Sequence, residues 1–583
     1  MTGPRPPQPA RSAAWYGGDD LGSFLHRVFA KGMGYGDDEL RRPVIGICST
    51  WSELNHCNRG LRDIAEAVKR GVLLAGGLPL EFPTISLGEF FVAPTSMILR
   101  NLAAMDTEEM IRAQPLDGVV LLGGCDKTTP AQLMGAASAN VPAIMVTTGP
   151  MLDGRFDGQA LGACTDCRRY WTEYRAGTVS AETMQALESA LARSVGHCMV
   201  MGTASTMAAL SEALGMMLPG GAAIPGPDSR RLLFAQQSGQ HVVRLATERV
   251  RPSDIMTAAA FENAIRVLHA LGGSTNAVVH LAAIAGRLGI DTPLDLFDRL
   301  SRETPWLANL RPAGQYQMER FFEAGGVPVV MKELEPLLHL GERTVTGRTV
   351  GENLAAVTVD DRWRDTIAAR AEPLAAEGGL AIVRGSLAPE GAVIKHAAAS
   401  PALLTHRGRA VVFTSPDDLN RRIDDPELDV AADDVLVMQD AGPVGAPGMP
   451  EIGNLPIPQK LLAQGVRDMV RISDARMSGT SFGTVVLHVA PESAVGGPLA
   501  AVRDGDLIEL DVPNRRLELL VPADEIARRL REEWQRPPPA YRRGYGKLFL
   551  DHVLQAPEGC DFDFLRGQPE DTAAESAAPV TRR

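Results

Sequence analysis

Three residues with reactive side chains stand together at the end of one apolar run. Residues 119–122 are followed by Gly123 and Gly124, and then by Cys125, Asp126 and Lys127. A β-type run that stops at glycines predicts a strand at whose carboxyl end the next side chains lie, and open α/β sheets usually bind their ligands at that edge. The thiol, carboxylate and amine could bind metals or transfer protons. Alternatively, Cys125 packs as a small hydrophobe and Asp126 caps the next helix.

Four further cysteines need an interpretation. Cys57 follows a predicted strand at 44–50, and Cys198 precedes a predicted helix. The thiolates of these two residues and of Cys125, from three separate loops, can converge on one metal centre, typically iron–sulfur or zinc. Three protein ligands leave a position open for substrate. Cys164 and Cys167 have C-x-x-C spacing, but no second such pair accompanies them, which favours an incidental loop pair.

Three carboxylates and a serine could supply oxygen ligands for a metal and a reactive hydroxyl. Glu89, Asp126 and Glu451 follow strands or lie in Gly/Pro-rich loops, where an oxygen-ligated Mg²⁺ would find its ligands, although loop carboxylates are usually just solvated. Ser478 stands in a tight Gly/Ser/Thr loop after a predicted strand. It could be a reactive hydroxyl, but no nearby histidine offers itself as a base, so a metal or a positive site would have to activate it. A plain turn serine is the alternative.

Length and composition bound the remaining possibilities. A chain of 583 residues is too long for one compact core, so at least two domains are expected. The net charge of −13 argues against a nucleic-acid or anionic-membrane surface. We find neither a signal-peptide pattern nor a membrane-span pattern. Seven scattered cysteines, an odd number, do not suggest a disulfide framework, and they favour a reducing cytoplasm.

Strands alternate with helices in the first part of the chain, which predicts a mainly parallel sheet with helices on both faces. The fold class predicted for residues 1–375 is therefore a three-layer α/β/α domain. The expected strands are 44–50, 80–85, 119–122 and 143–148. The expected helices are 61–74, 131–139, 181–195, 203–217, 258–271 and 276–288.

The pattern changes near residue 376. Short β-rich runs separated by Gly and Pro turns predict a β-barrel-like or sandwich domain over residues 376–583. The expected strands are 380–383, 410–413, 435–438, 469–472, 484–489, 507–512 and 516–521. The polar, alanine-rich stretch after Gly567 predicts a disordered tail.

A series of short motifs runs through the chain: GGCDKTTP at 123–130, GTASTM at 202–207, AIPG at 223–226, GGSTN at 272–276, LAPEGA at 387–392, GMPE at 448–451 and SDARMSGT at 473–480. In this order, over about residues 15–565, they resemble the dihydroxy-acid / sugar-acid dehydratase family. The stretches 309–322 and 544–565 look most similar to the aldonic-acid branch, typified by L-arabinonate and D-xylonate dehydratases.

The resemblance implies a hydro-lyase that converts an aldonic acid to its 2-keto-3-deoxy acid with the help of two metal centres. A [2Fe–2S] cluster, with [4Fe–4S] as the less favoured type, would act as Lewis acid on the C3 hydroxyl. A Mg²⁺ ion would bind the substrate carboxylate and C2 hydroxyl. The implied cluster ligands are Cys57, Cys125 and Cys198. The implied Mg²⁺ ligands are Glu89, Asp126, Glu451 and Lys127, the lysine as its carbamate because an ammonium has no lone pair.

Further roles follow from the same resemblance. Ser478, as an alkoxide, would remove the C2 proton, with Thr480 assisting and His552 contacting the substrate. The sequence departs from the family pattern at Cys167, where an aromatic or aliphatic residue is expected, so Cys167 could affect substrate choice. His197, beside the third thiol, could tune the cluster.

Other activities stay open. One is the dehydratase of branched-chain amino-acid synthesis, which acts on 2,3-dihydroxy-3-methyl acids, although the segment around His552 argues mildly against it. An aldolase with Lys127 as Schiff base and a non-catalytic iron–sulfur sensor are the others. We expect a cytoplasmic homo-oligomer, dimer or tetramer, whose partner is a small sugar acid rather than nucleic acid or membrane.

Overall fold

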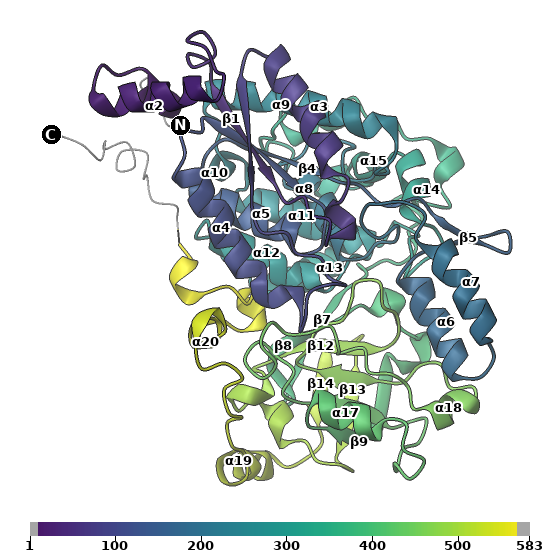
Figure 1. Cartoon of the computed structure of the whole chain (residues 1–583). Helices are drawn as coiled ribbons and strands as arrows, with labels where there is room; N and C mark the ends of the chain where they lie inside the picture. The colour runs from purple at the N-terminus through teal and green to yellow at the C-terminus, as the bar shows by residue number, and fades with distance from the viewer. Residues whose placement is uncertain (1–9, 568–583) are drawn as a thin grey trace.

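The computed structural model describes residues 10–567. An α/β part formed by the first two thirds of the chain lies above a C-terminal barrel (Figure 1). The tail predicted to be disordered after Gly567 lies outside the described residues. Within the described part, no helix combines the length and the apolar character that crossing a bilayer would need.

Four parallel strands form the central sheet of the α/β part. Their order is β2 (Leu78–Pro83), β1 (Val44–Ser49), β3 (Gly118–Gly123), β4 (Ala143–Thr147). Every residue of β1, β3 and β4 is buried. Such continuous apolar strands are typical of a parallel sheet that is covered on both faces.

Helices cover the two faces of this sheet. The helix α3 (Leu61–Leu74) contacts α9 (Ser229–Glu248), and both contact the strands. The helices α4 (Arg100–Arg112) and α5 (Thr128–Ala139) form a second contacting pair. The helix α3 leads the chain from β1 to β2, toward one edge of the sheet, whereas α4 and α5 lead it toward the opposite edge, to β3 and β4. Because βαβ crossovers are right-handed, α3 therefore lies on the opposite face of the sheet from α4 and α5. The predicted three-layer arrangement is confirmed.

The helix α9 was not predicted, and two glycines explain its position. A Cβ on Gly71 would lie 1.9 Å from the carbonyl oxygen of Gln236, and a Cβ on Gly239 would lie 2.3 Å from that of Val68. The backbones of α3 and α9 therefore approach more closely than any side chain would allow. Gly239 also interrupts the apolar periodicity of α9, and this hides the helix in the sequence.

The C-terminal part is a closed barrel, as the sequence predicted. Its strands are β7 (Ala381–Gly385), β8 (Ala388–Ile394), β9 (Thr405–Phe413), β10 (Val435–Met438), β11 (Arg471–Ser473), β12 (Val485–Ala490), β13 (Leu507–Asp511) and β14 (Arg516–Leu519). Around the barrel they follow the order β10-β11-β12-β8-β7-β14-β13-β9 and close between β9 and β10. The strand β8 was not predicted, because Pro389 and Gly391 give it the composition of a turn.

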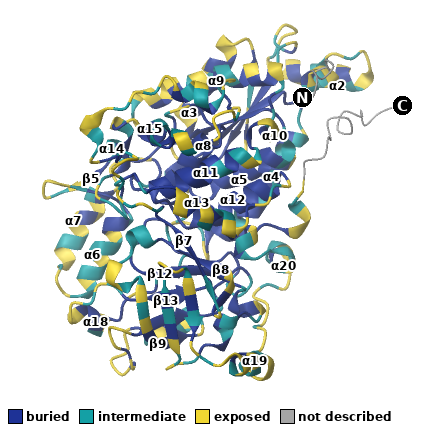
Figure 2. Cartoon of the chain, turned by 180° about the vertical axis from the view of Figure 1, so that it is seen from behind, coloured by how far each residue is buried: buried dark blue, intermediate teal, exposed yellow. Residues whose placement is uncertain are grey.

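The hydrophobic core of the α/β part extends to the first strands of the barrel, which has buried clusters of its own. Leu380, Ile382 and Val393, from the barrel end of the chain, belong to the same buried cluster as the sheet and helices of the α/β part. Buried residues continue from the sheet into the barrel without a break (Figure 2). Side chains supplied by the two parts can therefore be held in a fixed relation.

The C-terminal segment returns to the α/β part and is held there by buried polar contacts. The Arg287 side chain donates to both carboxylate oxygens of Asp561, at 2.5 and 3.0 Å, and both side chains are fully buried. Arg287 also donates to Glu108 at 3.2 Å. Arg100 donates to the carbonyl oxygens of Gly559 and Cys560 at 2.8 and 2.9 Å.

We expect Asp561→Ala to destabilise this docking, because it leaves a buried guanidinium with less compensation, a loss of about 3–5 kcal/mol. The thermal midpoint should fall, and proteases should cut the segment around residues 540–567 more rapidly. The control is Asp551→Ala, which removes an exposed pair with Lys547 and should cost at most about 1 kcal/mol. Equal midpoints for the two variants would contradict the assigned importance of Asp561.

Candidate active site

The strand order places two cysteines at one crevice. Cys57 follows β1 and Cys125 follows β3, and these two strands are neighbours in the sheet. Because the crossovers from β1 and β3 leave on opposite faces, a crevice opens at the carboxyl ends of the two strands. Cys57 lies in a short helical turn, η1 (His56–Asn58), which the Asn55 side chain caps by accepting from the amide of Asn58 at 3.3 Å.

The three predicted thiols lie near enough to one another to interact electrostatically. A hydrogen bond between Cys57 and Cys125, followed by burial, raises the pKa of the Cys57 thiol well above its ordinary value, and the neighbouring Cys198 adds to the effect. The pKa of the Cys198 thiol is also raised, first by a hydrogen bond with Cys164 and then by burial. The Cys164 and Cys198 sulfurs are 3.1 Å apart, and all seven cysteines are free. Cys164 therefore belongs to this thiol group, whereas the sulfur of the exposed Cys167 accepts from the Cys164 backbone amide at 3.3 Å.

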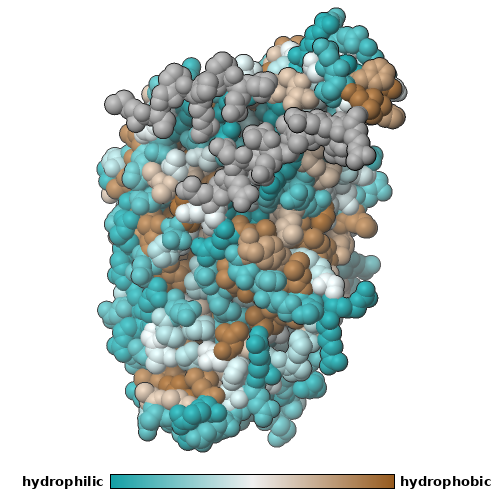
Figure 3. Space-filling view, turned by 90° about the vertical axis from the view of Figure 1, so that its left-hand side faces the viewer, coloured by the Kyte–Doolittle hydropathy of each residue, from teal (hydrophilic) through white to brown (hydrophobic). Residues whose placement is uncertain are grey.

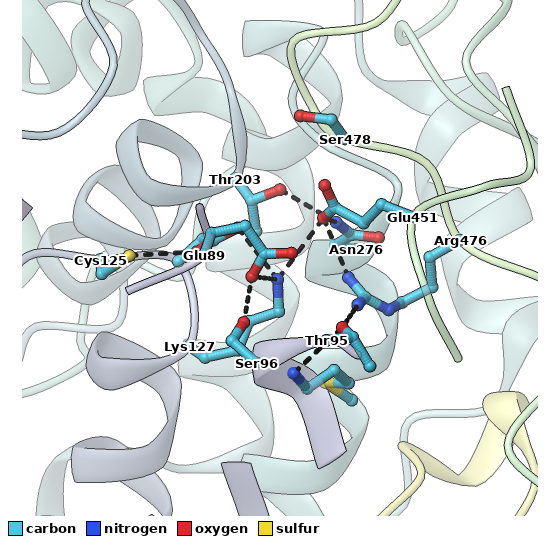
Figure 4. A network of polar contacts seen from close by, with 12 residues as sticks. Glu89, Thr95, Ser96, Cys125, Lys127, Thr203, Asn276, Glu451, Arg476 and Ser478 are labelled. Atoms are coloured by element: carbon cyan, nitrogen blue, oxygen red, sulfur yellow. Dashed lines mark hydrogen bonds and ion pairs between the residues drawn. The ribbon is translucent and has the colours of Figure 1, made fainter. Parts of the chain in front are cut away.

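A group of carboxylates adjoins the thiols. Glu89, Asp126 and Glu451 each place an oxygen within 4.8 Å of the others. The fully buried Lys127 lies among them, with Nζ at 2.8 Å from Glu89, 2.9 Å from Asp126 and 3.4 Å from Glu451 (Figure 4). The Cys125 thiol donates to Asp126 at 3.3 Å, so the sulfur group and the oxygen group are in direct contact.

Burial and charge act differently on the members of this acidic group. Burial and the nearby Arg476 disfavour the Lys127 ammonium, but the three carboxylates outweigh them and raise the pKa of Lys127 above its ordinary value. Burial raises the pKa of Glu89 to about 7, although Lys127 opposes the shift. Burial would also raise the pKa of Glu451, but Lys127 and Arg476 together lower it to about 2. Glu451 is therefore more firmly ionised than Glu89.

Residues that sequence reasoning missed hold Glu451 in place. Arg476 is fully buried and donates to Glu451 at 3.0 Å and to the Met449 carbonyl at 2.8 Å. The Asn276 amide donates to the same Glu451 oxygen at 3.0 Å and to Thr203 at 3.0 Å. Both residues lie inside motifs of the family resemblance, but nothing in the sequence pairs either with a particular carboxylate.

The loop that carries Ser478 docks on the α/β part. The Ser478 and Thr480 hydroxyls are 2.9 Å apart. A Cβ on Gly479 would lie 2.6 Å from both the Ser274 hydroxyl and the Thr203 amide. In Figure 4 Ser478 lies on the Asn276 and Glu451 side of the acidic group. The loop of the sequence-predicted serine is thus linked to the acidic group through Asn276, which donates to the Met477 carbonyl at 3.1 Å and to Glu451, although the loop comes from the barrel part of the chain.

Of the two histidines singled out in the sequence, His197 lies beside the thiol group and His552 does not. His197 is fully buried, and its Nδ1 is 3.2 Å from both the Ser205 hydroxyl and the Cys198 carbonyl, so it braces the Cys198 loop. Burial lowers the pKa of His197 to about 4. His552 ends α20 (Gly544–His552) and pairs with Asp563 at 3.0 Å. Within residues 10–567, the contacts of His552 with Asp563 and the Phe564 ring lie outside the thiol and acidic groups.

The arrangement places soft and hard donors side by side. Thiolates select iron–sulfur or similar soft centres, whereas carboxylates select Mg²⁺ and related hard cations. A small ligand between the two groups could touch both centres at once. A hydroxyl at its edge, that of Ser478, could then exchange a proton with such a ligand.

Comparisons with known proteins point to one family. Residues 42–353 match the N-terminal domain model, and residues 365–560 the C-terminal domain model, of dihydroxy-acid/6-phosphogluconate dehydratases. An L-arabinonate dehydratase of Rhizobium leguminosarum bv. trifolii is 52% identical over 96% of this chain and 97% of its own. A 6-deoxy-6-sulfo-D-gluconate dehydratase of Pseudomonas putida is 48% identical over 95% and 96%. A dihydroxy-acid dehydratase of Acidothermus cellulolyticus is 43% identical over 93% and 97%.

The chain belongs to the dihydroxy-acid/6-phosphogluconate dehydratase family. The predicted enzyme class, a hydro-lyase, and the resemblance seen in the motifs are both confirmed.

We expect Gly479→Ala to impair catalysis selectively. The added methyl group would collide with Ser274 and Thr203 and displace Ser478 by a fraction of an ångström or more, which we expect to lower dehydratase turnover about 10- to 100-fold. Metal content, measured by elemental analysis, should not change. The matched control is Gly341→Ala, where a Cβ meets nothing within 4 Å. Full turnover in Gly479→Ala would show that the position of this loop is not critical.

Proposed function

We propose that the protein dehydrates a C5 or C6 aldonic acid, such as L-arabinonate or D-xylonate, to the 2-keto-3-deoxy acid. The observation that carries the proposal is the direct contact between the thiol group and the acidic group at Cys125 and Asp126. The higher identity to an L-arabinonate dehydratase (52%) than to a dihydroxy-acid dehydratase (43%) supports a sugar acid over a branched-chain substrate.

The donor sets fit the two centres that this reaction requires. Cys57, Cys125 and Cys198 would hold an iron–sulfur cluster, for which we propose the [2Fe–2S] type, and three thiolates leave one coordination site open. The acidic group would hold Mg²⁺, since oxygens within 4.8 Å of one another are spaced as ligands of one ion. When bound, the two centres supply the Lewis acidity that acidifies the C2 proton and lets hydroxide leave from C3.

The position of Lys127 supports its carbamylation. As an ammonium it has no lone pair and would compete with a cation for the three carboxylates around it. As a carbamate it would add a fourth anionic oxygen donor. Four negative groups and the positive Arg476 would leave a net charge of about −3 on the site, which a divalent cation would reduce to about −1. A buried site of this kind favours the cation strongly.

Residues of this chain would bind the substrate and move its proton. Ser478, as an alkoxide, takes the proton from C2, and the electron pair of that C–H bond forms the C2–C3 double bond as the C3–O bond breaks. The leaving hydroxide takes the proton from Ser478 to become water, which restores the alkoxide. The Thr480 hydroxyl, 2.9 Å from that of Ser478, stabilises the charge on the serine oxygen by donating a hydrogen bond. Arg476 and Asn276 keep Glu451 in place. The enol that results tautomerises to the 2-keto-3-deoxy acid.

The experiment that tests the proposal is a 2-keto-3-deoxy acid assay. Protein purified anaerobically is given Mg²⁺ and a panel of C5 and C6 aldonates, with 2,3-dihydroxy-3-methylbutanoate for comparison. We expect at least one aldonate to be converted faster than the methyl-branched acid. Conversion of the methyl-branched acid alone would favour the branched-chain dehydratase. An iron-containing protein that converts no acid would favour a sensor.

Two substitutions should separate the roles of the thiol and of the serine. Cys125→Ser should lose both the visible iron–sulfur spectrum and turnover. Ser478→Ala should keep the spectrum and the Mg²⁺ content and lose about 10³-fold or more in kcat, because the proton acceptor is gone. Cys167→Ser, which removes an exposed thiol outside the group, should keep the spectrum. If Ser478→Ala is fully active, the proposed base is wrong.

We also propose that copies of the chain associate, and that they do so in a reducing cytoplasm, which the free cysteines favour. The helix α2 (Leu21–Gly32) supports association, because apolar side chains at helical spacing are exposed along it and just beyond its end. The exposed apolar residues are Leu21, Phe24, Leu25, Val28, Phe29 and Met33. Apolar surface is visible at the top of the molecule, in the region of α2 (Figure 3).

Phe29→Asp should reduce the molar mass measured by light scattering, because it places a charge in the apolar face where Phe29 is 72% exposed. The matched control is Leu74→Asp at the end of α3, where Leu74 is 65% exposed. A monomeric unmodified protein, or an oligomer that Phe29→Asp leaves intact, would contradict association through α2.

A further inference from the structure

The helix α6 (Thr165–Arg175) begins at the edge of the candidate active site. The Cys164 thiol, just before it, lies 3.1 Å from that of Cys198. The Thr165 hydroxyl donates to the carbonyl oxygen of Thr480 at 2.8 Å. The start of α6 therefore touches both the thiol group and the loop that carries Ser478, so the face of α6 that bears these two contacts looks into the site.

Arg168 lies on that same face. It follows Cys164 by four residues and Thr165 by three, and residues at these spacings are neighbours on a helix surface. The next residue, Arg169, points elsewhere: its guanidinium donates to Asp166 at 2.9 Å and lies over the Tyr170 ring at 4.2 Å. The two consecutive arginines thus have different surroundings.

Within the described part of the chain, the Arg168 guanidinium has no partner. Its Nε is completely enclosed and, among residues 10–567, makes no hydrogen bond, and no ion pair joins the side chain to a carboxylate. The fully buried Arg100 and Arg476, in contrast, bond to carbonyl oxygens or carboxylates. Arg168 as a whole is only half-buried, so its outer nitrogens can meet water, whereas the enclosed Nε cannot. An enclosed donor without an acceptor is unfavourable, so its presence indicates an acceptor that the protein itself does not supply.

Arg168 approaches the site from α6, on the side of Cys164 and Cys198, because α6 begins with the contacts of Cys164 and Thr165. Its charge also helps to lower the pKa of Glu451, after those of Lys127 and Arg476. A substrate with C1 and C2 at the acidic group and C3 at the thiols would extend its remaining carbons toward α6.

We propose that Arg168 binds the C4 and C5 hydroxyl groups of the sugar acid and so selects polyhydroxylated acids over 2,3-dihydroxy acids with alkyl ends. This inference rests on the proposed function and names the part of the substrate that determines selectivity. A hydroxyl oxygen accepts from the guanidinium, whereas an alkyl end would leave the enclosed Nε unpaired.

The test compares a pentonate that the enzyme converts with 2,3-dihydroxypentanoate of the same C2 and C3 configuration, which lacks only the C4 and C5 hydroxyls. Arg168→Met should lower kcat/KM for the pentonate roughly 10- to 100-fold, the range expected for one charge-assisted hydrogen bond, and change that for the deoxygenated acid by less than about threefold. Arg168→Lys should restore part of the loss. The matched control, Arg175→Met on the last turn of α6, removes a pair with Asp424 and should change neither value.

A binding measurement makes the test independent of turnover. In a Ser478→Ala background, Arg168→Met should raise the Kd for the pentonate by a similar factor, while iron and Mg²⁺ contents stay the same. Equal losses for both acids would place Arg168 at the carboxylate end or in a structural role, and no loss for either would exclude it from the site; either result overturns the proposal. Conversion of aldonates by the unmodified protein tests the proposed function and does not depend on Arg168.

Discussion

The balance of charge around Lys127 is the constraint on which the site depends. Three largely enclosed carboxylates surround two fully buried cations, and an isolated buried charge of this kind would be strongly unfavourable. Lys127, Glu89 and Asp126 come from the α/β part, whereas Glu451 and Arg476 come from the barrel part. Neither part is electrostatically complete alone, so docking of the two parts and formation of the site are a single event.

Close backbone packing fixes the positions of these charged side chains relative to one another. A Cβ on Gly124 would lie 1.9 Å from the Thr148 hydroxyl, so only glycine allows the turn that leads from β3 to Cys125. On the barrel side, Gly479 packs equally tightly against Ser274 and Thr203. The glycines in the motifs of this chain therefore position reactive residues from both parts to within a fraction of an ångström, and the core beneath them resists movement.

The sequence was sufficient to predict individual helices and strands, and the edge of the sheet at which the residues after the parallel strands lie. The helices 61–74 and 258–271 have the predicted bounds, because their apolar periodicity is uninterrupted. Cys57 and Cys125 could be assigned to one edge, because both follow strands. Partnerships across the fold could not be predicted. The bonds of Arg476 and Asn276 to Glu451, and the contact of Cys164 with Cys198, join residues whose separation in the chain gives no signal.

One turn of backbone accounts for the coupling of the two donor groups. Cys125, Asp126 and Lys127 follow β3 directly and precede α5, and the change from strand to helix sends successive side chains in different directions. The sulfur of the first residue joins the thiol group, and the carboxylate and amine of the next two join the acidic group. Because the donors are covalently adjacent, the spacing between the two centres cannot vary. On the proposed function, a substrate that touches both groups spans them with only a few atoms, which leaves selectivity to residues beyond them, such as those of α6.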